Sequence, residues 1–254
     1  QMADAQTKTP EAAKKAVENA KAAAANPKKA AKVATWTKLA SSYMDAYNAP
    51  AGNAWLGASK QELQLLMGSQ KPVAVENVVV GGEQLVKEVY EDKEFYFNAN
   101  GQLVIINITK PVFEDALAEA VEAYKKAHEV DVKGSKTKDI KEGLSIIARK
   151  YLDDGMNCYT FGDLAAASKL FEKAALASAT APLSKADTTA LYNAGYTAWA
   201  VKDLERAKNF FEQCLAVDYY YEGGEVFAKL GDVYSQLGDA KKGAETLEQG
   251  FVKF

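Results

Sequence analysis

Apolar and small residues recur at helical spacing through the second half of the chain, in stretches separated by short polar turns. One order of residue types occurs three times there, and the copies begin roughly 40 and 36 residues apart. Each copy has a small residue before a two-residue turn and small, bulky and small residues after it, which predicts a helical hairpin. The copies are Tyr151, Gly155, Gly162-Asp163, Ala167, Phe171 and Ala174; Leu191, Gly195, Lys202-Asp203, Ala207, Phe211 and Cys214; and Phe227, Gly231, Gly238-Asp239, Gly243, Leu247 and Gly250.

The residue types in this order have a physical reason. A small residue in the first helix lets the second helix approach closely, and the bulky residue of the second helix fills the gap. At the turns, Gly162 and Gly238 can adopt the positive φ that ends a helix. Asp163, Asp203 and Asp239 can accept a hydrogen bond from the free amides of the helix that follows.

Over residues 148–254 the pattern resembles the tetratricopeptide repeat, a family of helix-turn-helix units that mostly bind peptides or proteins. The resemblance implies a solenoid of hairpins whose first helices line a concave binding face. It places a candidate partner-binding set on that face, comprising Met156, Tyr159, Tyr192, Tyr196 and Trp199.

Three members of this set, Tyr192, Tyr196 and Trp199, follow the i, i+4, i+7 spacing of one helix stripe. Large aromatic side chains supply much of the binding energy at protein interfaces. The same spacing also suits a stripe packed into the core, and the sequence leaves both interpretations open. The family's clamp for a C-terminal carboxylate is not expected, because Met156 and Tyr196 stand where its asparagines would be, and Tyr192 and Ala228 where its lysines would be.

A fourth hairpin is predicted earlier in the chain, split in two. Its first helix belongs to residues 10–47, together with an opening Ala-rich helix between Pro10 and Pro27, and its second helix lies in 111–130. The three intact repeats occupy 136–254, so we expect residues 1–254 to form one tetratricopeptide-like array. The residues that match the pattern are Trp36, Leu39, Ala40 and Tyr43 in the first half and Leu117, Ala120, Tyr124 and Ala127 in the second.

The insertion at 48–110 has a different composition. Four segments rich in β-branched and aromatic residues, separated by glycine and asparagine turns, predict a small antiparallel β-meander in an otherwise mainly α-helical fold. The unbroken apolar run Leu103 to Ile106 suggests a strand covered on both faces. Apolar residues before Pro72 predict a short helix or an ordered lid. The expected strands are 73–80, 84–91, 93–98 and 103–109.

Composition and charge argue against a nucleic-acid-binding protein and against a membrane-spanning one. The 254 residues are 48% hydrophobic and 26% charged, and 31 basic against 34 acidic residues give a net charge of −3. Since no run of Lys or Arg is interleaved with aromatics, no nucleic-acid partner is expected. No apolar run is long enough to predict a membrane span.

Candidate chemistry is sparse. The one histidine, His128, lies on a predicted helix and has no partner ligands at metal-binding spacing, so we expect no metal and no cofactor. Cys158 and Cys214 fall at packing positions of the repeats, where they are expected to be buried small hydrophobes. With no catalytic constellation, the chain is predicted not to be an enzyme.

The whole arrangement resembles a group of exported repeat proteins of Bacteroidetes-type bacteria, which implies the periplasm or cell envelope. A sequence starting at Gln1 fits a cleaved export signal and equally a trimmed chain. The expected function is a scaffold that binds a protein or peptide. The alternative is a structural protein that forms homo-oligomers through its C-terminal end, where Phe251 and Phe254 would otherwise be exposed.

Overall fold

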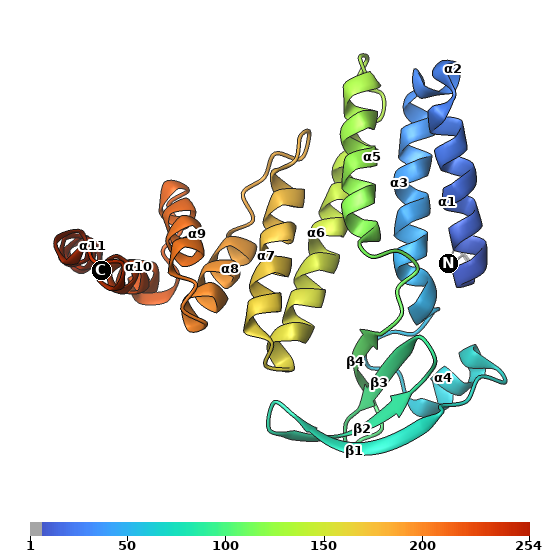
Figure 1. Ribbon diagram of the computed structural model, residues 1–254, viewed down its shortest axis with the longest axis horizontal. Helices are drawn as coiled ribbons and strands as arrows, with labels where there is room; N and C mark the ends of the chain where they lie inside the picture. Colours follow the sequence, from blue (N-terminus) through green and yellow to red (C-terminus); the bar gives the residue numbers. More distant parts are fainter. Residues whose placement is uncertain (1–6) are drawn as a thin grey trace. The chain divides into compact units, whose positions relative to one another are not determined.

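The computed structural model describes residues 7–254, which are mostly helical with one small antiparallel sheet (Figure 1). The chain divides into two compact units, Gln1–Gly143 and Leu144–Phe254. The boundary falls inside a continuous helix, α6 (Thr137–Thr160). The single array over 1–254 stays a prediction.

Three long helices of the first unit lie side by side, with α3 between α1 and α5 (Figure 1). The first begins where the sequence predicts, since Pro10 occupies its first turn and the Thr9 hydroxyl accepts a hydrogen bond from the amide of Ala12. The helices of this layer are α1 (Pro10–Ala25), the short α2 (Pro27–Ala30), α3 (Val33–Asn48) and α5 (Ala116–Val130).

α3 and α5 pack together although the whole insertion separates them in the sequence. The small residues Ala40 of α3 and Ala120 of α5 are both fully buried. α6 then approaches α5 closely: a Cβ atom on Gly143 would lie 2.2 Å from Cζ of Tyr124. These contacts are the ones expected of a helical hairpin that an insertion has opened.

The insertion forms the predicted meander, with strand order β1-β2-β3-β4 and antiparallel pairing throughout. A 3-10 turn, η1 (Ala49–Ala51), and α4 (Lys60–Met67) precede it. α4 is the predicted short helix, and its capping box pairs the Ser59 and Glu62 side chains with backbone amides. The strands are β1 (Ala74–Val80), β2 (Glu83–Val89), β3 (Lys93–Phe97) and β4 (Leu103–Ile108).

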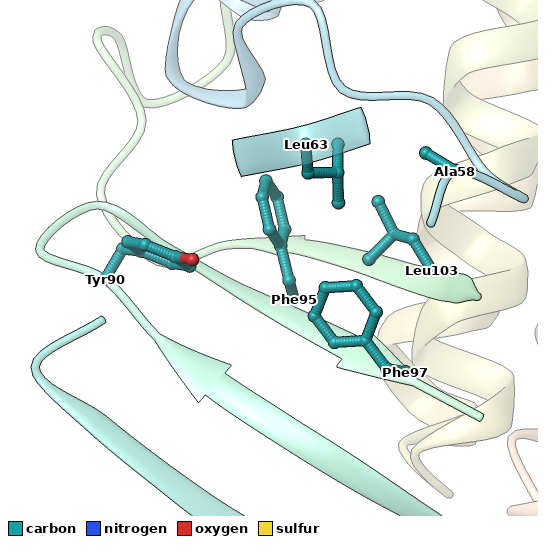
Figure 2. Close-up of a cluster of buried hydrophobic side chains, with 6 residues drawn as sticks. All are labelled: Ala58, Leu63, Tyr90, Phe95, Phe97 and Leu103. Carbon is teal, nitrogen blue, oxygen red and sulfur yellow. The ribbon is translucent and has the colours of Figure 1, made fainter. Parts of the chain in front are cut away.

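Apolar clusters lie on both faces of this sheet. Figure 2 shows one cluster, in which Leu63 of α4 lies over Phe95 and Leu103. The other contains Leu85, Tyr96 and Ile105. A bulge between Tyr96 and Phe97 shifts the register, so that Leu103 pairs with Phe97 while Ile105 pairs with Tyr96. The run Leu103 to Ile106 therefore serves both faces, which confirms the prediction of a strand covered on both sides.

The second unit contains the three predicted hairpins. In each, a Cβ atom on the first-helix glycine would collide with the bulky residue of the second helix: Gly155 with Phe171, Gly195 with Phe211, and Gly231 with Leu247, at 2.6 to 2.8 Å. The close helix approach that the pattern predicts is confirmed. After α6 the helices are α7 (Leu164–Ala179), α8 (Thr188–Ala200), α9 (Leu204–Ala216), α10 (Glu225–Gln236) and α11 (Ala240–Lys253), with the 3-10 turn η2 (Glu222–Gly224) before α10.

Two of the three hairpin turns follow the prediction in full. Gly162 and Gly238 have φ of +84° and +93°, and the carboxylates of Asp163 and Asp239 accept hydrogen bonds from amides of the next helix. The prediction was wrong for Asp203, which makes no side-chain cap. Its carboxylate instead lies 3.4 Å from Nε of Arg206, one turn into α9.

Candidate binding surface

The predicted aromatic residues of the second unit lie on α8, whose start is fixed by Asp187. Its carboxylate accepts a hydrogen bond from the amide of Ala190 at 3.0 Å. Tyr192, Tyr196 and Trp199 then follow one another along the helix, with ring centroids about 6 Å apart at each step. Tyr192 is 6% exposed, whereas the other two are half-buried.

Tyr192 is held by contacts within the unit. Its ring stacks on Tyr221 with a centroid distance of 4.1 Å and an interplanar angle of 10°. Its hydroxyl donates to a carboxylate oxygen of Glu225 at 2.8 Å. Burial, followed by that hydrogen bond, raises the pKa of Tyr192 well above its ordinary value. Most of this ring therefore faces other residues of the chain, in the manner of a core position.

Tyr196 and Trp199 share a cation from α10. Nζ of Lys229 lies 4.6 Å from the Trp199 centroid and 5.4 Å from the Tyr196 centroid, within the range of a cation–π contact. The same ammonium lies 2.7 Å from a carboxylate oxygen of Glu225. The ion pair with Lys229, and then the hydrogen bond from Tyr192, lower the pKa of Glu225.

The indole of Trp199 is fixed at its polar edge, because Nε1 donates to Asp232 at 2.8 Å. Gln236, one turn further along α10, donates to the same carboxylate oxygen at 2.5 Å. The α8–α10 surface, as we call it, is thus a pair of half-buried aromatic rings held in place by the next hairpin. It consists of Tyr196, Trp199, Lys229 and Asp232.

The other two predicted residues, Met156 and Tyr159, lie one hairpin earlier on α6. They are 46% and 41% exposed, so both present apolar area to solvent. The sequence-predicted set therefore has three environments: Tyr192 is buried, Tyr196 and Trp199 are half-buried in a network, and the α6 pair is exposed. Whether any of them contacts a partner stays a prediction.

A hollow of about 440 Å³ lies between α7, α9 and the loop before α8. Two of its three charged lining residues, Glu172 and Asp187, already have partners, and the third is Lys185. Glu172 pairs with Arg206 at 2.6 Å, and Asp187 caps α8. The rest of the lining is largely apolar and includes Leu176, which is 62% exposed.

The described residues offer little for catalysis. Within 7–254, no three His, Cys, Asp or Glu side chains gather as a metal site would require. Burial raises the pKa of the fully buried Cys214 thiol to about 12 and also raises that of Cys158, which is half-buried; both thiols are free. Since the thiolate is the reactive form, both cysteines are poor nucleophiles at neutral pH. His128 is exposed on α5.

Sequence reasoning missed the residues that hold the aromatic rings in place. The i, i+4 spacing of Glu225 and Lys229 is a signal for a helix ion pair. The run Tyr219 to Tyr221 just before α10 was a visible aromatic cluster. Neither signal states that these residues reach back to α8, because that contact depends on how successive hairpins stack.

Comparison with known proteins agrees with this geometry at one place. The pattern of the tetratricopeptide repeat matches residues 188–220, which span α8, its turn, α9 and the first residues beyond. The chain contains a tetratricopeptide repeat. Such repeats are typically non-catalytic modules for protein interaction, and the three aromatic residues of α8 lie in the matched repeat.

Over most of the chain, similarity to a solved structure is low. The crystal structure of BtubC (BKLC) from P. vanneervenii aligns at 16% sequence identity and a TM-score of 0.35, covering 95% of this chain and 88% of that chain. No curated protein matches the chain. Among the described residues, no helix has the length and apolar character needed to cross a membrane.

Proposed function

We propose that the protein is a non-enzymatic scaffold that binds a protein or peptide through the α8–α10 surface. The observation that carries the proposal is the pair of Tyr196 and Trp199 in the tetratricopeptide repeat, which are half-buried and contacted by Lys229 and Asp232 of α10. Rings held in place before binding lose little conformational entropy when a partner covers them. An apolar or mixed peptide, or one helix of a partner, suits such a surface.

The proposal extends beyond the matched repeat. The hairpins α6–α7 and α10–α11 share the glycine and bulky-residue contact of the matched repeat, which supports a longer array with Met156 and Tyr159 on the same concave face. A location in the bacterial periplasm or envelope is part of the proposal and is supported by the resemblance of the sequence to exported repeat proteins.

Selection of binding peptides from a displayed library would test the surface directly. Peptides selected on the native protein should lose at least tenfold in affinity with Trp199→Ala, which removes the larger ring. Ala228→Arg, at an exposed position of α10, should also weaken binding without removing a packing contact. Leu176→Ala, an exposed apolar residue of α7 in the hollow, is the matched control and should bind normally. Equal affinities in all four proteins would overturn the proposal.

A second candidate function, self-assembly, is favoured by the exposed apolar residues of α11. Phe251 and Val252 are 85% and 84% exposed. Phe254 remains 61% exposed even though its ring contacts Tyr220 and Phe227. Light scattering should show an oligomer in the native protein and a monomer after Phe251→Asp. A native protein that stays monomeric over the accessible concentrations would eliminate this candidate.

A further inference from the structure

The two edges of the sheet differ in how their backbones are covered. At β4, the amide of Leu103 donates to the carbonyl of Ala58 and its carbonyl accepts from the amide of Gly57, at 2.8 and 2.7 Å. An isolated bridge between Ser59 and Gln102 continues this cover. In the described part of the chain, β1 pairs with β2 alone. Alternate N–H and C=O groups of β1 therefore point outward without a strand to bond them.

β1 also lacks the features that usually protect an edge strand. Its seven residues, AVENVVV, include no proline and no lysine, and its pairing with β2 is continuous without a bulge. Val75 and Val79 are 60% and 66% exposed. The one charged residue, Glu76, lies 3.8 Å from Nζ of Lys87 on the neighbouring strand. Lys87 also lies 3.0 Å from a carboxylate oxygen of Glu94 on β3, so Glu76 is only partly neutralised. The edge is thus long and largely apolar, with one charged residue.

We propose that β1 pairs with β1 of a second copy of this chain, in antiparallel register about a two-fold axis through Asn77. The axis stands perpendicular to the sheet, as the local two-folds of antiparallel strands do, and it joins two four-stranded sheets into one. Val75 then lies opposite Val79 of the second copy, twice by symmetry. Ala74 lies opposite Val80 of the second copy, so every residue of the strand has a partner.

The charge on the strand selects this register. An axis through Glu76 would set two carboxylates directly opposite each other, which destabilises a strand pair. An axis through Val78 would leave the first residues of β1 without partners from the strand. With the axis at Asn77, Glu76 lies opposite Val78 of the second copy. The two glutamates are then only diagonal neighbours, and each lies 3.8 Å from Nζ of Lys87 of its own chain.

The size of the contact sets the expected strength. One strand on each side covers much less than the roughly 800 Å² per partner of a stable interface. The dimer should therefore be weak and concentration-dependent. Backbone hydrogen bonds and two valine pairs at its centre fix the register. Figure 1 shows β1 at the outer side of the sheet, with β2 between it and β3.

Sedimentation equilibrium from about 10 µM to about 1 mM tests the proposal, a range chosen because small interfaces are weak. The native protein should shift from monomer to dimer within it. The double substitution Val75→Lys with Val79→Lys sets lysine against lysine across the axis, and the protein should remain a monomer. Val75→Lys with Val79→Glu sets lysine against glutamate at both pairs, and dimerisation should return. Both positions are largely exposed, so the fold is expected to tolerate these changes.

Two further results decide the matter. Hydrogen exchange of the β1 amides should become slower at high protein concentration in the native protein and in the Val75→Lys/Val79→Glu (Lys/Glu) protein. It should not change in the Val75→Lys/Val79→Lys (Lys/Lys) protein. Phe251→Asp should leave this dimer intact, which separates it from assembly through α11. A native protein that is monomeric at about 1 mM overturns the proposal. So does a Lys/Glu protein that behaves like the Lys/Lys protein, or a dimer abolished by Phe251→Asp alone.

Discussion

A missing methyl group decides how closely α8 and α9 approach. A Cβ atom at Gly195 would lie 2.8 Å from Cε1 and 2.9 Å from Cδ1 of Phe211, closer than real carbon contacts allow. Phe211 is fully buried, so its ring has little room to move. The same relation holds for Gly155 and Phe171 in the preceding hairpin. At the residue scale, the repeat pattern therefore reflects a steric requirement: the glycine leaves space that the bulky residue of the second helix fills.

Gly195→Ala should therefore destabilise the protein despite the better helix propensity of alanine. Overpacking costs about 1–3 kcal/mol, and alanine returns about 1 kcal/mol in a helix interior, which leaves a net loss of about 1 kcal/mol. Urea unfolding measures it. In a Phe211→Leu background the smaller side chain gives room, and the loss should shrink or change sign. An equal loss in both backgrounds would show that the Phe211 ring is not the cause.

At the scale of elements, α8 and α10 are joined by a short polar network behind the aromatic rings. Glu225 accepts from both Tyr192 and Lys229, and Asp232 accepts from Trp199. The network links the matched tetratricopeptide repeat to the next hairpin. It contains no buried side-chain polar atom without a partner, as holds throughout the described residues. Substitutions in α10 that break these contacts should therefore alter the positions of the aromatic rings on α8.

The titration of Glu225 makes this link measurable. Its pKa in the folded protein lies below the ordinary 4.5, so its stabilisation is complete above that pH and is lost as the pH falls through the folded pKa. Glu225→Gln should flatten this acid-dependent part of the unfolding free energy. Since the carboxylate is about one-third exposed, we expect a difference of about 0.5 kcal/mol between pH 7 and pH 3.

Denaturant unfolding at the two pH values provides the measurement. Glu248→Gln, at an exposed position of α11, serves as the control and should follow the native protein. If both substitutions change the pH dependence equally, the lowered pKa of Glu225 plays no part in stability.

The contrast between elements explains what the sequence could predict. Helix positions, strand segments and the glycine contacts follow from local spacing, and the structure confirms them within a few residues. The burial of Tyr192 did not follow, because it depends on Tyr221 and Glu225, which reach it from the next hairpin. The missing cap at Asp203 has a local cause, because Nε of Arg206, three residues along the same helix, lies 3.4 Å from the carboxylate. Pairings between hairpins depend on stacking geometry, which a repeat pattern does not encode.

On the scale of the whole molecule, the chain forms two compact units whose cores are built differently. The first combines a helix layer with a sheet that has apolar clusters on both faces. The second is made of helical hairpins alone. α6 passes through the boundary without a break, so the units share a helix while most of their packing is their own.

Phe95→Ala should reveal how independent the units are. Phe95 is fully buried in the cluster between α4 and the sheet, and its truncation should cost about 3–5 kcal/mol. Amide hydrogen exchange should quicken within the first unit, most of all in β3 and β4, while α8 to α11 keep their native rates. Equal acceleration in both units would show that they unfold as one cooperative body.

The opened hairpin of α3 and α5 has a consequence for the order in which the chain folds. Hairpins of the second unit close over a few residues, so their contacts can form early. α3 can meet α5 only after the insertion has brought its two ends together, and the entropy of closing that long loop opposes the encounter. Contacts between residues distant in sequence slow folding. We therefore expect the first unit to reach its native state last.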